Sequence, residues 1–125
     1  MILDTNAVSA LLAGDSALGR VLAVTNKHHL PLTVTGEYLF GLMASNKRGA
    51  LEPIFEQLET ESIILFPNRE TAVHYAEIRH ALRQLGTPIP ENDVWIAALA
   101  VQHSLQIVSR DPHFDHVHDV QRIAW

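Results

Sequence analysis

Short apolar runs alternate along this chain with longer segments whose apolar residues recur at helical spacing. The first pattern indicates buried strands and the second indicates amphipathic helices. The strands that we expect are Met1 to Leu3, Leu30 to Val34, Ser62 to Phe66, Gln106 to Ser109 and Val120 to Ala124. The helices that we expect are Asn6 to Leu12, Ser16 to Asn26, Gly36 to Lys47, Leu51 to Glu59, Asn68 to Leu85 and Asp93 to His103.

This alternation predicts an α/β fold. Strands that alternate with helices form a parallel sheet with right-handed crossovers, covered by helices on both faces. We therefore expect a three-layer α/β/α arrangement with four to five parallel strands. Thr35, Asn68 and Asn92 are expected to cap helix N-termini, and Gly14 and Gly86 to end helices. The segment 94–101 is apolar on nearly every side, so its helix should lie in the interior.

Four carboxylates stand where an apolar segment meets a turn or a helix start: Asp4, Glu37, Asp93 and Asp111. In a parallel sheet, strand C-termini and the N-termini of the following helices share one edge, and ligands bind there. Each acid could singly be an ordinary helix cap or turn residue. Their conjunction at one edge of one sheet favours a shared site instead.

A ring of acids is unfavourable unless a cation neutralises it, and carboxylate oxygens suit Mg²⁺ or Mn²⁺. One or two such ions could activate water for hydrolysis of a phosphodiester. This chemistry needs no Ser, Cys or His nucleophile, and we find no convincing Ser/His/Asp pattern in the chain.

Composition narrows the classes of protein that fit. The 125 residues suit one domain, 1–125, with 47% hydrophobic residues and no cysteine, so disulfides and cysteine-ligated metals are excluded. We expect a soluble, cytoplasmic protein, because there is no basic start before an apolar region and no run long enough to span a membrane. The net charge of −5 is a mild argument against nucleic-acid binding, because contact with phosphates normally requires a basic surface. Without the four acids, 9 positive residues face 10 negative ones, which is close to balance.

Several segments together resemble the PIN-domain nucleases, and within them the VapC-type toxins of bacterial toxin–antitoxin pairs. The segments are Asp4-Thr5-Asn6, Glu37 at the start of a helix, Asn92-Asp93-Val94-Trp95-Ile96-Ala97-Ala98, and Ser109-Arg110-Asp111-Pro112-His113-Phe114. The resemblance covers essentially the whole chain. It implies strand order 3-2-1-4-5 and a Mg²⁺- or Mn²⁺-dependent endoribonuclease with an RNA substrate, a cognate antitoxin and a homodimeric state.

The same resemblance assigns roles to residues. Asp4, Glu37, Asp93 and Asp111 match the family's acidic quartet, and Thr5, Asn6 and Ser109 match polar positions that would orient the acids through hydrogen bonds. Asp115, a second late acid, could share or replace the role of Asp111. The chain has little length before Asp4, so the first strand could be frayed.

A histidine-rich segment follows the last acid of the quartet. His113, His116 and His118 alternate with acids there and could hold zinc, but their spacing matches no closed zinc motif. We interpret them as residues of a surface loop that are solvated or cap their neighbours.

Basic residues that could steer RNA phosphate are Arg110, Lys47 and Arg48, although solvated helix faces explain them equally well. The same choice applies to large apolar residues expected on one helix: Leu39, Phe40, Leu42 and Met43 could form an antitoxin surface or simply fill the core.

Two other functions fit parts of the pattern. A non-catalytic binding module could use the acid pocket to grip a basic partner segment. A phosphatase of the haloacid-dehalogenase type also begins with a strand-end Asp, but it normally has a second Asp two residues later, where this chain has Asn6. The nuclease hypothesis makes use of all four acids, so we favour it.

Overall fold

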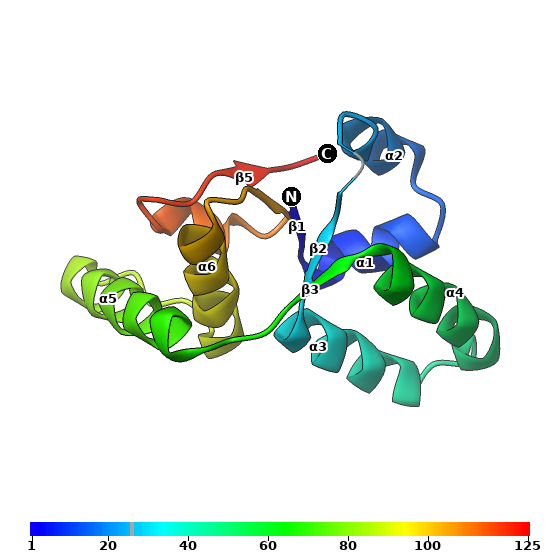
Figure 1. The fold of residues 1–125 in the computed structure, drawn as a ribbon, viewed down its shortest axis with the longest axis horizontal. Helices are drawn as coiled ribbons and strands as arrows, with labels where there is room; N and C mark the ends of the chain where they lie inside the picture. The colour runs from blue at the N-terminus through cyan, green and yellow to red at the C-terminus, as the bar shows by residue number, and fades with distance from the viewer. Residues whose placement is uncertain (26) are drawn as a thin grey trace.

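The computed structural model describes residues 1–25 and 27–125. Its centre is a five-stranded parallel sheet in the order β3-β2-β1-β4-β5, as the resemblance implied (Figure 1). The strands are short: β1 is Ile2–Leu3, β2 His29–Pro31, β3 Ile63–Leu65, β4 Ile107–Val108 and β5 Arg122–Ile123. The predicted α/β class and strand order are therefore confirmed.

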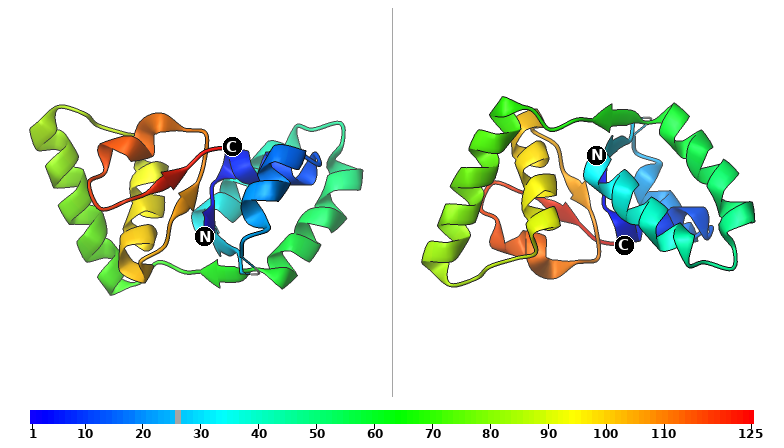
Figure 2. Two further views of the ribbon diagram at one scale, coloured as in Figure 1. Left: turned by 90° about the horizontal axis from the view of Figure 1, so that it is seen from above. Right: turned by 90° about the horizontal axis from the view of Figure 1, so that it is seen from below.

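Six α-helices and one 3₁₀ helix surround the sheet in the described residues. They are α1 Thr5–Leu12, α2 Ser16–Leu22, α3 Leu32–Met43, α4 Arg48–Glu61, α5 Arg69–Leu85, α6 Glu91–His103 and the 3₁₀ helix η1 Pro112–His116. Helices α1 to α4 gather on one side of the sheet, and α5 and α6 lie on the other (Figures 1 and 2). The predicted three layers are therefore present.

The strand order places a topological switch at the middle of the sheet. β1 pairs with β2 on one side and with β4 on the other, with Ile2 opposite both His29 and Ile107. The chain leaves β1 into α1 and leaves β4 into η1, so two turns open side by side at the carboxyl edge. Ligands bind at such a point in open parallel sheets.

The core occupies both sides of the strands. Fully buried members include Ile2, Leu3, Leu30, Ile107 and Val108 from the sheet, Val8, Leu18, Val34, Phe55, Ile96 and Leu99 from the helices, and Phe114 from η1. Helix α6 buries seven of its thirteen residues, which confirms the prediction that it lies in the interior. Burial of this helix fixes the position of Asp93 in its first turn.

Helix α3 begins earlier than the sequence predicted. Leu32 to Val34 were expected to continue a strand, but β2 ends at Pro31 and α3 starts at Leu32. Val34, Tyr38 and Leu42 then recur at i, i+4 and i+8 and point into the core. Packing of this stripe outweighs the weak strand preference of β-branched residues. Consequently Thr35 is buried in the first turns and is not the N-cap.

Other predicted boundaries also shift. Helix α3 ends at Met43 and α4 begins at Arg48, so the predicted helix to Lys47 divides at a turn in which Ser45 Oγ accepts from the Lys47 N–H at 3.1 Å. Helix α2 ends at Leu22, and the predicted end at Asn26 lies outside the described residues.

The ends of α5 and α6 differ in how well the sequence predicted them. Helix α5 has the predicted N-cap Asn68 and the predicted Gly86 in the left-handed conformation at its end. Helix α6 starts at Glu91 directly after Pro90, which is its N-cap residue, so Asn92 is not the cap. Pro90 has an extended ψ of 145°, so the first turn forms from Glu91 onward. No helix in the described ranges is long and apolar enough to cross a membrane.

Candidate metal centre

Asp4 lies at the end of β1, where it is the N-cap of α1. Its Oδ1 accepts a hydrogen bond from the Thr5 N–H at 2.8 Å. Its Oδ2 accepts from the Ser109 hydroxyl at 2.6 Å and from the Asn6 amide at 3.2 Å. Only 4% of Asp4 is exposed, so these three hydrogen-bond donors, and not bulk water, solvate the carboxylate.

Glu37 is joined to Asp4 through the intervening residue Thr5. The Thr5 hydroxyl donates to Glu37 Oε2 at 2.9 Å, although the two residues are 32 positions apart. Glu37 comes from the second turn of α3 and Thr5 from the start of α1, and these helices pack together. This hydrogen bond holds Glu37 near the edge of the sheet where β1 ends.

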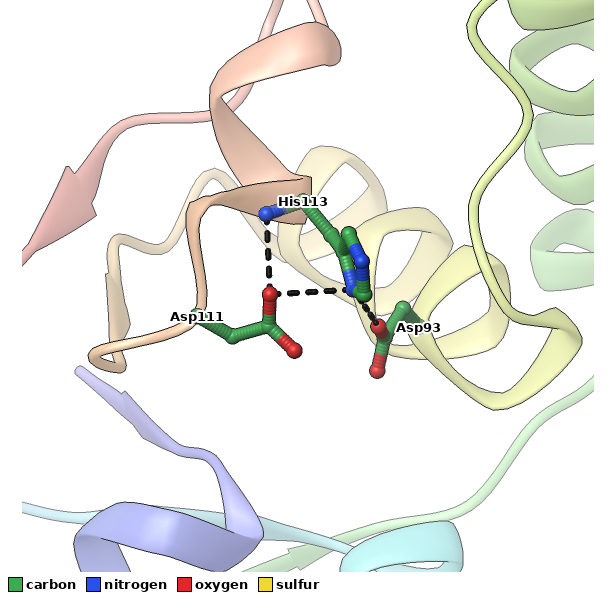
Figure 3. A group of neighbouring side chains, drawn as sticks. All are labelled: Asp93, Asp111 and His113. Atoms are coloured by element: carbon green, nitrogen blue, oxygen red, sulfur yellow. Dashed lines mark hydrogen bonds and ion pairs between the residues drawn. The ribbon is translucent and has the colours of Figure 1, made fainter.

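Asp93 and Asp111 are bridged by His113 (Figure 3). The His113 Nδ1 lies 3.0 Å from Asp93 Oδ2 and 2.9 Å from Asp111 Oδ1. Asp93 comes from the first turn of α6, whereas Asp111 and His113 come from the turn after β4. One ligand-capable atom from each residue lies within 4.8 Å of the others, which is a spacing that a single metal ion could bridge.

Ser109 connects the two halves of the site. It is fully buried at the end of β4, and its hydroxyl accepts from the Asp111 N–H at 3.0 Å while donating to Asp4. The Asn6 amide nitrogen donates to the same hydroxyl at 3.1 Å, and the Asn6 Oδ1 accepts from the Arg110 N–H at 3.1 Å. All three polar neighbours expected from the sequence, Thr5, Asn6 and Ser109, therefore hold acids of the quartet in place.

The electrostatics follow from burial and from like charges. Desolvation raises the pKa of Asp4, the Ser109 hydrogen bond lowers it, and the charges of Glu37 and Asp111 raise it further. Desolvation likewise raises the pKa of Asp93 to about 6, the His113 hydrogen bond opposes that shift, and the charges of Asp4 and Asp111 add to it. Asp4 thus lies within electrostatic reach of the other three acids, and a cation bound among them would stabilise their ionised forms.

Asp115 lies apart from this group. Both of its carboxylate oxygens accept from the Arg122 guanidinium, at 2.8 and 2.7 Å. This hydrogen bonding lowers the pKa of Asp115, the opposite of what happens at Asp4 and Asp93. The prediction that Asp115 shares the site receives no geometric support.

His113 was expected to be a solvated or capping residue of a surface loop; it lies in η1, and its Nδ1 is placed against Asp93 and Asp111. His118, in contrast, is fully at the surface beside Asp119, as expected of a loop residue. The sequence did carry a signal for His113: Asp111-Pro112 begins a short turn in which Asp111 Oδ1 accepts from the His113 N–H at 2.9 Å. That turn returns the imidazole to the carboxylate two residues earlier.

The basic candidates differ in where they lie. Arg110 bonds Asp15 at 3.3 Å and stacks on the Trp125 ring at 4.4 Å, and Arg48 pairs with Glu52 at 3.4 Å. Lys47 lines a groove of about 460 Å³ between α1, α3 and α4 that also contains Thr5 and Glu37. The groove is continuous with one side of the acidic group.

Comparison with known proteins agrees with this fold and arrangement of acids. The family model of the PIN domain matches residues 1–120, so the chain belongs to the PIN-domain family. Within the family it is similar to the VapC-type toxins of VapBC toxin–antitoxin systems. Ribonuclease VapC1 of Haemophilus influenzae strain R2866 is 31% identical over 71 residues, which are 55% of this chain and 53% of that protein. The chain thus spans about half the length of the curated relatives it matches.

Solved structures extend the similarity of fold to nearly the whole chain. VapBC2 from Rickettsia felis, bound to a DNA fragment from its promoter, has a TM-score of 0.86 at 22% identity and covers 99% of this chain and 97% of its own. FitAcB from Neisseria gonorrhoeae has a TM-score of 0.83 at 27% identity, and the match covers 98% of this chain and 95% of that one. VapBC-1 from nontypeable Haemophilus influenzae has a TM-score of 0.82 at 24% identity, and the match covers 99% of this chain and 96% of that one.

Proposed function

We propose that this protein is a divalent-metal-dependent endoribonuclease and the toxin component of a toxin–antitoxin pair. The observation that carries the proposal is the network that links Asp4, Glu37, Asp93 and Asp111 at the carboxyl edge of the sheet. These acids come from four separate segments, and Thr5, Ser109 and His113 join them. Membership of the PIN-domain family and similarity to ribonuclease VapC1 support the same activity.

The donor atoms at the site fit a hard divalent ion. Carboxylate oxygens of Asp93 and Asp111 lie close enough to share an ion, and Asp4 and Glu37 add charge beside them. We propose one or two Mg²⁺ or Mn²⁺ ions held by these four acids, a choice that rests on the preference of such ions for carboxylates. A bound ion of this kind supplies activated water and neutralises charge that develops on phosphate.

The residues around the acids have their own part in this chemistry. Ser109 and Asn6 fix the orientation of Asp4, and Thr5 fixes that of Glu37, so the carboxylates are positioned before any ion binds. Positioning matters because small displacements of a reacting group slow catalysis greatly. Because its pKa is about 6, Asp93 is mostly ionised at neutral pH and available to bind a cation there.

The RNA would approach over the groove beside Glu37. Lys47 lines that groove, whereas Arg48 and Arg110 are engaged with Glu52 and Asp15. We therefore propose Lys47 as the main phosphate contact among the three basic candidates. A single basic side chain in contact with phosphate is consistent with the acidic net charge of the chain, −5.

The antitoxin is proposed to cover the apolar surface of α3. Leu42 is buried in the core, but Leu39, Phe40 and Met43 are 41%, 80% and 66% exposed. Adjacent exposed large apolar residues often indicate a protein partner. Solved structures of similar fold include a toxin–antitoxin complex from Klebsiella pneumoniae. The homodimeric state and the cytoplasmic location remain predictions.

Cleavage mapping tests the proposed activity directly. The purified chain is incubated with total RNA and Mn²⁺, with and without a chelator, and new RNA ends are sequenced. We expect cuts at defined sites that disappear with the chelator and with Asp4→Ala, while Asp115→Asn cuts like the unaltered protein. The proposal is wrong if no RNA is cut, or if Asp4→Ala cuts at the same sites, and the non-catalytic binding module would then be favoured.

A further inference from the structure

The imidazole of His113 occupies a position that a metal ligand would take. Its Nδ1 is 3.0 Å from Asp93 Oδ2 and 2.9 Å from Asp111 Oδ1, and all three atoms belong to the one group with metal-binding spacing in the described residues (Figure 3). His118, in contrast, is fully at the surface, where it pairs with Asp119. His113 is therefore distinguished from its neighbours by geometry.

The chain holds His113 there through local structure. The Asp111 carboxylate accepts a hydrogen bond from the His113 N–H. Pro112, just before His113, is the first residue of η1, and Phe114, just after it, is fully buried. A proline and a buried aromatic residue on either side restrict the backbone of His113. The backbone consequently holds the imidazole beside the two carboxylates.

The distances match those between neighbouring ligands of an octahedral ion. Bonds of about 2.0–2.1 Å at right angles place adjacent ligand atoms roughly 2.9 Å apart. The two separations from Nδ1, 3.0 and 2.9 Å, agree with two such edges. The two carboxylate oxygens also lie within 4.8 Å of each other, so all three residues could reach one ion after small adjustments.

We propose that His113 Nδ1 is a direct ligand of the metal ion, and that it makes the site favour transition-metal ions over Mg²⁺. The inference rests on the proposed function, which places a divalent ion between the acids. Imidazole nitrogen binds transition-metal ions readily, whereas Mg²⁺ favours oxygen and retains its waters. A site of two carboxylates and one imidazole thus differs in its ion preference from one built of carboxylates alone.

Pulsed electron paramagnetic resonance with Mn²⁺ as the only added ion detects the proposed bond directly. A nitrogen bonded to Mn²⁺ modulates the spin echo, and an oxygen does not. We expect nitrogen modulation in the unaltered protein and in His118→Asn, the matched control, and none in His113→Asn. Asparagine can place an oxygen where Nδ1 lay, so His113→Asn retains a ligand and a fold while it loses the nitrogen.

Calorimetric titration measures the proposed preference. We expect His113→Asn to lower the Mn²⁺ affinity by about 10-fold or more, since altering groups that tune a metal site costs 10- to 100-fold. The Mg²⁺ affinity should change less than about 3-fold, because an oxygen ligand suits that ion.

The possible failures are distinguishable. Mn²⁺ that binds the unaltered protein without nitrogen modulation would overturn the His113 assignment, leaving the imidazole as a hydrogen-bond partner and the proposed nuclease intact. Equal losses of Mn²⁺ and Mg²⁺ affinity in His113→Asn would overturn the preference. If the unaltered protein bound neither ion, the His113 assignment and the proposed function would both be rejected.

Discussion

The Asp93 carboxyl is unfavourable to ionise in the folded protein. Burial raises its pKa to about 6, and Asp4 and Asp111 add to the shift. The folded protein therefore holds this proton more tightly than the unfolded chain does. The corresponding stability is fully present below the unfolded pKa, near 4, and is lost as pH rises through about 6.

Asp93→Asn should consequently stabilise the metal-free protein at neutral and alkaline pH. The amide removes the cost of ionisation and still accepts from His113 through its oxygen. We expect the free energy of unfolding at pH 8, measured with urea in the presence of a chelator, to rise by roughly 1–3 kcal/mol. The difference should vanish below about pH 4. A variant less stable than the unaltered protein at pH 8 would show that the carboxylate mainly stabilises the helix start.

Asp115→Asn is the control variant, in which the free energy of unfolding should change in the opposite direction. The Arg122 hydrogen bonds lower the pKa of Asp115, so its contribution is present above the unfolded pKa and is lost as pH falls through the lower folded value. The same urea measurement should show Asp115→Asn to be less stable than the unaltered protein at pH 8. The two variants change the same chemical group, and only the surroundings differ.

At the scale of elements, the N-termini of α5 and α6 give a matched pair of asparagines. Asn68 accepts from the Thr71 N–H at 3.1 Å, and the Thr71 hydroxyl accepts from the Asn68 N–H at 2.9 Å, which forms a capping box. Asn92 is an exposed residue within the first turn of α6. Asn68→Ala should lower the free energy of unfolding by about 1 kcal/mol.

Asn92→Ala should stay within about 0.5 kcal/mol of the unaltered protein, as is usual for surface positions without a special role. Thermal unfolding of both variants under one condition makes the comparison. A loss at Asn92 equal to that at Asn68 would contradict the start of α6 at Glu91 and would support the cap that the sequence suggested.

The same elements show what sequence patterns can predict. Helix α5 was predicted closely because its signals are local: the Asn68 cap at one end and Gly86 at the other. The start of α3 was missed because Leu32 to Val34 satisfy a strand pattern and a helical stripe equally well. Packing of Val34, Tyr38 and Leu42 against the core decides between them, and that information is not local.

The candidate site was predictable to a similar degree. The convergence of the acids followed from where strands end in a parallel sheet, and Asp4 lies within electrostatic reach of Glu37, Asp93 and Asp111. The bridging position of His113 and the Arg122 partner of Asp115 were missed. Both depend on how the turn after β4 folds back, and spacing along the chain does not specify that path.

At the scale of the whole molecule, the sheet order joins residues that are distant in sequence. Asp4 meets Ser109 across 105 positions because β1 pairs with β4. Formation of the site therefore requires the central strands to pair, and an ion bound there should stabilise the entire fold by mass action. Binding of the proposed ion should therefore raise the global stability of the protein.

The exposed apolar surface of α3 is also a property of the whole molecule. Phe40→Glu should leave the free energy of unfolding within about 0.5 kcal/mol, because the side chain is 80% exposed. We expect it to abolish co-purification with the antitoxin proposed above. Val24→Glu, at a position 83% exposed outside α3, is the matched control and should leave co-purification intact. Retained binding in Phe40→Glu would place the antitoxin elsewhere.

The central claim is that distant acids converge to hold a divalent ion, and titration of the metal-free protein with Mn²⁺ tests it most directly. We predict saturable heat of binding in the unaltered protein and in Asp115→Asn, and a loss of at least 10-fold in affinity in Asp4→Ala and Asp93→Asn, in line with the effects of altering groups at metal sites. Absence of binding, or equal affinity in all four proteins, would contradict the account.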